Sequence, residues 1–112
     1  MRLTRGDTKY FKFARKDAEG NIITERAEKL YFTVKPDFDE DEVVIQKTID
    51  DMTFDEDGWY HFVLEPDDTN YLEFSAYVYD IEVYIPSRDY VQTIAKGYFI
   101  LDKEVTHKRN EV

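Results

Sequence analysis

The segment from residue 66 to residue 83, PDDTNYLEFSAYVYDIEV, constrains the fold of this chain more than any other. Pro66 fixes its own φ and has no N–H for a ladder, so it ends a preceding strand. Leu72 stands five residues before Tyr77. This spacing is typical of a tyrosine corner, in which an apolar residue closes the core and a buried tyrosine binds a backbone group upstream. Leu72 and Tyr77 are therefore predicted to form a structural corner between two packed sheets.

Apolar and polar side chains alternate along the stretches on both sides of this corner. Leu30, Phe32 and Val34 alternate with more polar neighbours, and residues 59–64 follow the same period of two. The pattern predicts strands over residues 8–13, 30–35, 43–49, 59–64, 77–84 and 90–101. Short strands with turn signals every 8–12 residues or so predict an all-β, antiparallel β-sandwich of about seven strands. A small barrel is the competing architecture.

The stretches between the strands have the composition of turns and solvated loops. Gly20 and Asn21 tolerate positive φ, so a hairpin-like reversal is expected there. The acidic stretches 37–42 and 50–58 are expected to be exposed, the second one anchored by Met52 and Phe54. Within the last strand, Gly97 predicts either a bulge or a close backbone approach.

Length and charge narrow the class of protein. The 112 residues predict one domain over residues 1–106 and a loose tail over 107–112. Twenty-five acidic against fifteen basic residues give a net charge of −10, which disfavours nucleic acids and anionic membranes as partners. No apolar run approaches the roughly 20 residues of a membrane helix. Without cysteine, the chain has neither disulfides nor thiolate zinc ligands.

No motif supplies catalytic, cofactor or metal chemistry. Residues 53–58 resemble the opening of a calcium loop, but Leu64 stands where the bidentate glutamate belongs, so a solvated turn is predicted. Weak adventitious calcium binding in this acidic loop is left open. His61 and His107 do not form a pair, and exposed carboxylates lack the desolvation that would separate their pKa values. The sequence predicts a protein that is not an enzyme.

Aromatic residues left over after the inward faces are assigned form the candidate interface. Aromatic side chains are enriched in the centres of protein interfaces, although they also suit sheet faces that loops cover. We therefore give equal weight to an interface and to a sheet face that loops cover. The predicted interface residues are Trp59, Tyr71, Phe74, Tyr84 and Tyr90.

Short motifs along the chain occur in an order and spacing similar to those of a known family. They are Arg5-Gly-Asp-Thr8, Phe11-x-Phe13, Asp17-x-x-Gly20-x-x-x-Thr24, Tyr31-Phe-Thr-Val-Lys35, Ile45-Gln-Lys47, Gly58-x-Tyr60-x-Phe62, Asp68-Thr-x-x-Leu72, Tyr77-x-Tyr79-Asp-Ile81, Gly97-x-Phe99 and Glu104-Val-Thr106. With them the chain resembles small virion proteins from the tail modules of phages of Gram-positive bacteria. The similarity is to the amino-terminal domain of phage baseplate upper proteins.

This resemblance implies an immunoglobulin-like sandwich that attaches components to a phage tail or baseplate. It further implies no catalytic residues, other phage structural proteins as partners, a homo-oligomer, and a place in the virion after assembly in the bacterial cytoplasm. Full-length baseplate upper proteins continue into an oligomerising region, so a stand-alone adaptor or a head-surface protein is also expected. The alternative is a host-surface or glycan-binding module that presents loops 37–42 and 50–58. A weaker third possibility is an acidic inhibitor that mimics nucleic acid.

Overall fold

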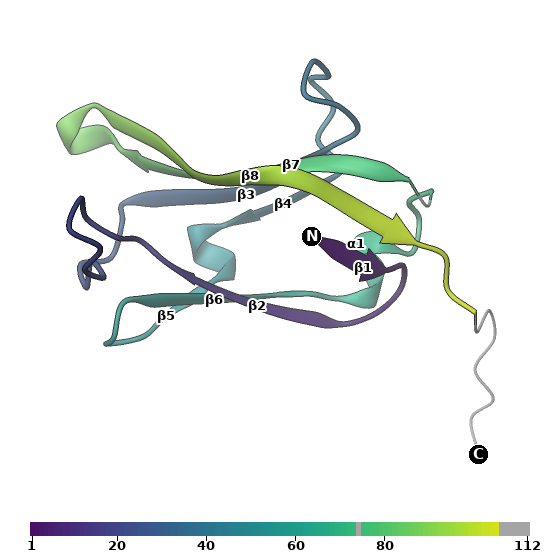
Figure 1. Cartoon of the computed structure of the whole chain (residues 1–112), viewed down its shortest axis with the longest axis horizontal. Coiled ribbons are helices and arrows are strands. Elements are labelled where there is room, and N and C mark those ends of the chain that lie inside the picture. The colour runs from purple at the N-terminus through teal and green to yellow at the C-terminus, as the bar shows by residue number, and fades with distance from the viewer. Residues whose placement is uncertain (74, 106–112) are drawn as a thin grey trace.

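Two β-sheets pack face to face in this protein, as Figure 1 shows for the computed structural model, which describes residues 1–73 and 75–105. The predicted tail 107–112 and the candidate Phe74 lie outside the described residues. The elements are β1 (Arg2–Thr4), β2 (Lys9–Ala14), β3 (Lys29–Lys35), β4 (Ile45–Thr48), the 3-10 helix η1 (Ile49–Asp51), β5 (Thr53–Phe54), β6 (Trp59–Leu64), α1 (Pro66–Thr69), β7 (Ala76–Ile85), the 3-10 helix η2 (Pro86–Arg88) and β8 (Tyr90–Asp102). None of the described helices is long and apolar enough to cross a membrane.

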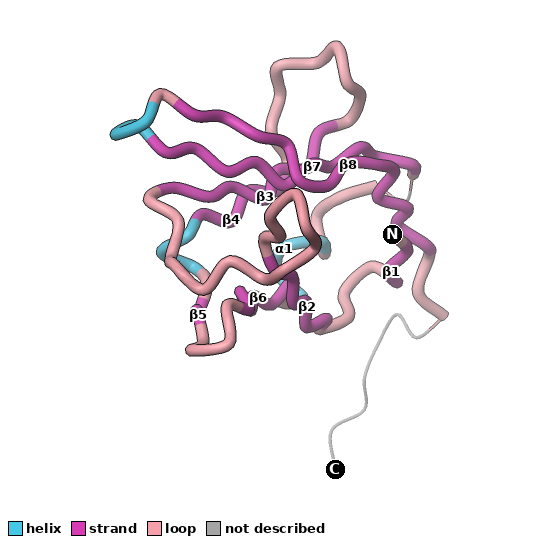
Figure 2. Tube along the Cα trace, turned by 60° about the vertical axis from the view of Figure 1, so that its left-hand side comes forward, coloured by secondary structure: helices cyan, strands magenta, loops and turns pink. Residues whose placement is uncertain are grey.

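The strands form one large and one small sheet. The five-stranded sheet has the order β1-β8-β7-β3-β4, and the three-stranded sheet has the order β2-β6-β5. In Figure 2 the small sheet lies across from the large one, and the β7–β8 hairpin extends outward with η2 at its tip. Two separately hydrogen-bonded sheets confirm the predicted all-β sandwich over the competing barrel.

One pairing departs from the predicted antiparallel arrangement. β1 runs parallel to β8, with Arg2 opposite Ile100 and Thr4 opposite Asp102. Residues 2–4 were not predicted as a strand, because three residues are too few to show a period of two. They pair at all because the end of β8 is already held by β7 and offers them a free edge.

Alternating inward side chains build the core between the sheets. Leu30, Phe32 and Val34 of β3 are fully buried, and Tyr60 and Leu64 of β6 face them from the small sheet. The rings of Phe32 and Phe62 lie 4.9 Å apart, and the rings of Phe13 and Tyr60 lie 5.2 Å apart. Stacked and tilted rings at these distances add attraction beyond the area that they bury.

The corner follows β6 and has the geometry of a tyrosine corner. Pro66 starts α1, and the Asp68 carboxylate accepts a hydrogen bond from the Glu65 amide at 2.7 Å. Beyond the helix Leu72 and Tyr77 are both buried, at 7% exposure. The Tyr77 hydroxyl donates to the Glu73 carbonyl at 2.7 Å, which ties the start of β7 to the segment before it.

The structure between β3 and β6 differs in two places from that predicted from the sequence. β4 covers only Ile45–Thr48 of the predicted strand 43–49, because the chain turns into η1 at Ile49. The acidic stretch 50–58 was predicted to be loop but contains η1 and the two residues of β5, with Met52 buried as expected. The exposure of residues 37–42 and the reversal at Gly20 (φ 86°) are confirmed.

The irregularity in β8 lies three residues before the predicted place. Ile81 pairs with Ala95 and Glu82 with Thr93, so Ile94 is the extra residue of the bulge. Gly97 is instead a site of close approach. A Cβ at Gly97 would lie 3.4 Å from the ring of Tyr79 on β7, at the edge of ordinary van der Waals contact.

We expect Tyr77→Phe to lower the free energy of unfolding by about 1–3 kcal/mol, because the substitution removes the donor for a partly buried carbonyl. Tyr71→Phe is the matched control. Its hydroxyl also donates to a backbone carbonyl, that of Val44, but Tyr71 is 69% exposed. Water can replace that bond, so the control should lose about 0.5 kcal/mol or less. Chemical denaturation of both variants measures the difference, and equal losses would contradict the role of the corner.

Candidate functional site

The four predicted interface residues that the structure describes lie on different parts of the fold. Trp59 begins β6 and lies on the outer face of the small sheet, since Tyr60, Phe62 and Leu64 point inward. It is partly covered, because the Lys12 ammonium lies 4.9 Å from the centre of its ring. This is a cation–π contact within the protein.

The other described candidates are spread over the ends of the large sheet. Tyr71 follows α1, near the start of β7. Tyr84 and Tyr90 lie at the other end of β7, beside the hairpin turn, where Tyr90 is 41% exposed and donates to Gln92 Oε1 at 2.6 Å. The described candidates therefore lie on different sheets and ends, and their role as an interface stays a prediction. Alternation along each strand showed that they point outward but not that they belong to different sheets and ends.

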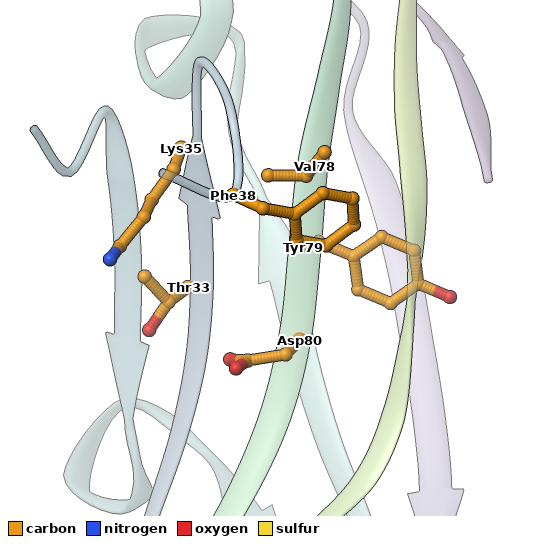
Figure 3. A pocket seen from close by; sticks show the side chains of 6 residues that line it. All are labelled: Thr33, Lys35, Phe38, Val78, Tyr79 and Asp80. Atoms are coloured by element: carbon orange, nitrogen blue, oxygen red, sulfur yellow. The ribbon is translucent and has the colours of Figure 1, made fainter. Parts of the chain in front are cut away.

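Another aromatic pair lies on the outer face of the large sheet. Phe38, from the acidic connection after β3, is 56% exposed and meets the ring of Tyr98 edge-on at 6.3 Å. Phe38 also lines a small hollow of about 90 Å³ over β3 and β7, shown in Figure 3. The residues around the hollow are Thr33, Lys35, Phe38, Val78, Tyr79 and Asp80. Val78 of β7 is only 6% exposed, since it lies beside Phe38 in the wall of this hollow.

Sequence reasoning missed this pair. Phe38 stands within an acidic run that was treated as uniformly solvated, and Tyr98 stands in a strand in which its neighbour Phe99 is the inward residue. A large aromatic residue among acidic residues was the available signal, because such a side chain gains by covering a nearby apolar surface.

Asp80 provides the carboxyl group of the hollow. Partial burial raises the pKa of its carboxyl above the ordinary value, and the positive charge of Lys35 opposes this rise. Lys96 lies opposite Asp80 on β8, and Thr33 lies opposite it on β3. The hollow is too small for a drug-sized ligand.

Among the described strands, β8 has the longest unpaired edge. β1 pairs only with Ile100–Asp102, and the amino group of Met1 donates to the carbonyl of Tyr98 at 3.0 Å. From Tyr90 to Gly97, no described strand covers the side of β8 away from β7. This stretch carries no acidic residue in a chain that has twenty-five. An open, nearly neutral strand edge is able to pair with another strand.

The calcium-like turn uses its oxygen atoms locally. Asp55 Oδ1 accepts hydrogen bonds from the amides of Asp57 (3.0 Å) and Trp59 (2.9 Å), and Oδ2 lies 2.9 Å from His61 Nε2. These contacts, the one with His61 first, lower the pKa of Asp55. Over residues 1–73 and 75–105, no group of three or more metal-ligating side chains comes together.

Comparison with known proteins adds no relative, since no protein family and no curated protein matches this chain.

We expect Asp80→Asn to raise the free energy of unfolding at pH 7 by roughly 0.5 kcal/mol or less, because the carboxyl is partly exposed and solvent screens its charge. Burial disfavours the ionised carboxylate, so the folded protein binds this proton more tightly than the unfolded chain does. The carboxylate therefore costs stability above the raised pKa, and the cost disappears as the pH falls below the ordinary pKa of aspartate.

Thermal denaturation at pH 7 and pH 4 tests this dependence. The increase in melting temperature caused by Asp80→Asn should be smaller at pH 4 than at pH 7. Asp39→Asn removes the same charge from the exposed acidic connection and serves as the control. An advantage that is equal for the two variants, or that grows towards pH 4, would contradict the assignment.

Proposed function

We propose that this chain is a non-enzymatic phage virion structural protein that acts through protein–protein docking. Its place is the tail or baseplate, or the surface of the head, and its partners are other phage structural proteins and further copies of itself. The motifs from Arg5 to Thr106 that resemble baseplate upper proteins support this assignment. The sandwich fold is compatible with it.

We propose further that the sandwich is of the immunoglobulin-like type. If the strands β1 to β8 are lettered A, B, C, C′, D, E, F and G, the small sheet reads B-E-D and the large sheet reads A-G-F-C-C′. This order agrees with immunoglobulin-type sandwiches, and Tyr77 stands at the start of strand F, where tyrosine corners occur.

The open edge of β8 is the structural feature that best supports docking. Sheet edges with unpaired N–H and C=O groups add strands from partners, and side chains on either face then select the partner. Val91, 58% exposed, and Tyr90 stand beside this edge, and Phe38 and Tyr98 add an apolar patch on the adjoining face. The absence of acidic side chains from Tyr90 to Leu101 lets a second acidic copy approach without like charges meeting there.

Mass measurement in solution and in purified phage particles tests this proposal. We expect a defined oligomer or incorporation into particles, and we expect Val91→Lys to weaken the association about tenfold by placing a charge in the docking edge. Val105→Lys is the matched control, since Val105 is 94% exposed and lies outside the strands. A chain that stays monomeric at high concentration and is absent from particles would refute the proposal.

A host-surface or glycan-binding module is the second candidate. It is favoured by the aromatic pair of Phe38 and Tyr98 next to the polar groups of Thr33 and Asp80. The two acidic loops first considered for this role do not support it together, because residues 37–42 follow the end of β3 while the turn at 55–58 lies towards its start.

A glycan array separates this candidate from the first. Binding that is lost in Tyr98→Ala and kept in Trp59→Ala would place a sugar site on the large sheet, and the opposite result would place it at Trp59. No binding by the wild-type protein would rule the second candidate out.

A further inference from the structure

One end of the sandwich contains a hollow of about 270 Å³, separate from the surfaces described above. The connection between β2 and β3 forms one wall and the turn after β7 forms another. In Figure 1 these segments lie at the end of the molecule away from β1 and α1. The charged residues that line the hollow are Arg15, Glu25, Arg26, Glu28 and Arg88.

Arg15 is buried in this hollow without a partner for its charge. It is 8% exposed, and its Nε is inaccessible and makes no hydrogen bond. Within residues 1–73 and 75–105, it is the only buried side-chain nitrogen or oxygen left without a bond. The backbone of Arg15 is paired, since its carbonyl accepts a hydrogen bond from the Ile23 amide at 2.9 Å. Burying an unpaired guanidinium costs free energy, and this cost is recovered when an anion binds it.

The two glutamates of the hollow are engaged elsewhere. Glu28 accepts hydrogen bonds from the Ser87 amide (3.0 Å) and the Ser87 hydroxyl (2.9 Å), so it holds the hairpin turn in place. Glu25 lies 3.9 Å from the Arg88 guanidinium, in a pair that is largely exposed to solvent. Neither carboxylate neutralises Arg15. Three arginines against two glutamates leave a positive balance at this point of a chain with a net charge of −10.

We propose that this hollow is a binding site for a small oxyanion, a carboxylate or phosphate group, with the Arg15 guanidinium as its principal ligand. The planar guanidinium presents parallel N–H donors that match two oxygens of such a group. Arg26 and Arg88 at the rim add attraction at longer range. The volume suits the head group of a small anion or of one acidic side chain. The proposal does not rest on the virion assignment, because it follows from the buried charge alone.

Nuclear magnetic resonance of the Arg15 Nε–Hε group in the full chain tests the site. We expect a saturable shift of this signal on titration with sodium acetate or sodium phosphate and no such shift with sodium chloride at the same ionic strength. A third titration uses N-acetylglutamate amide, which carries its carboxylate on a side chain as a partner protein would. Equal binding of acetate and the blocked glutamate identifies a site for a partner's acidic side chain, and binding of acetate or phosphate alone identifies a site for a free ion.

Variants establish that Arg15 is responsible, with the backbone amide signals around the hollow as the readout. Arg15→Met should weaken oxyanion binding at least about tenfold, and Arg15→Lys should have an intermediate effect because it keeps the charge but loses the paired donors. Arg2→Met is the matched control, since it removes the same charge from the salt bridge with Asp102 near β1. Its affinity should stay within about twofold of the wild type.

The melting temperature gives an independent readout in buffer without oxyanions. Arg15→Met should melt at the same temperature as the wild type or higher, since the guanidinium has no partner to lose. A wild-type response to acetate and phosphate that equals the response to chloride would overturn the proposal. Retention of oxyanion binding in Arg15→Met would also overturn it.

Discussion

Aromatic rings from β2, β3 and β6 pack against one another between the two sheets, and the other features of the structure depend on this contact. Phe62 lies at its centre, with ring distances of 4.9 Å to Phe32 and 5.1 Å to Phe11. The chain has no cysteine, so no covalent link replaces this packing. The buried Tyr60 also anchors the polypeptide outside the sheets, because its hydroxyl accepts a hydrogen bond from the Ala27 amide at 2.8 Å.

The same packing decides which groups are left for interaction. Because one side of every long strand is committed to the core, the remaining chemistry lies on the outer faces, the strand edges and the two ends. Asp80 and Phe38 lie on an outer face, Tyr90 begins an open edge, and Arg15 lies at an end. The edge and the Arg15 hollow are independent features. An experiment that refutes docking at the edge therefore leaves the proposed anion site intact, and the reverse also holds.

Much of the fold could be predicted from the sequence, and less of the candidate site. The inward positions of β3 and β6 follow from local alternation, and the corner follows from the spacing of Leu72 and Tyr77. The strand β1 escaped prediction because its pairing depends on the edge of β8, some ninety-eight residues later in the chain. The role of the five aromatic candidates stays a prediction, because local patterns do not say which outward residues share a surface.

The sequence by itself determined the class of fold, the inward faces of the long strands, the corner and the excess of negative charge, because each of these depends on residue types and short spacings. Only the tertiary structure decided that Phe38 covers the large sheet, that no described strand pairs with Tyr90 to Gly97 on the side of β8 away from β7, and that Arg15 is buried without a counter-charge among the described residues. Each of these three depends on segments distant in sequence, whose distances are fixed only when the two sheets pack. Local periodicity in the sequence predicts which side chains of a chain are buried. Its binding surfaces depend instead on which distant segments come together when the two sheets pack.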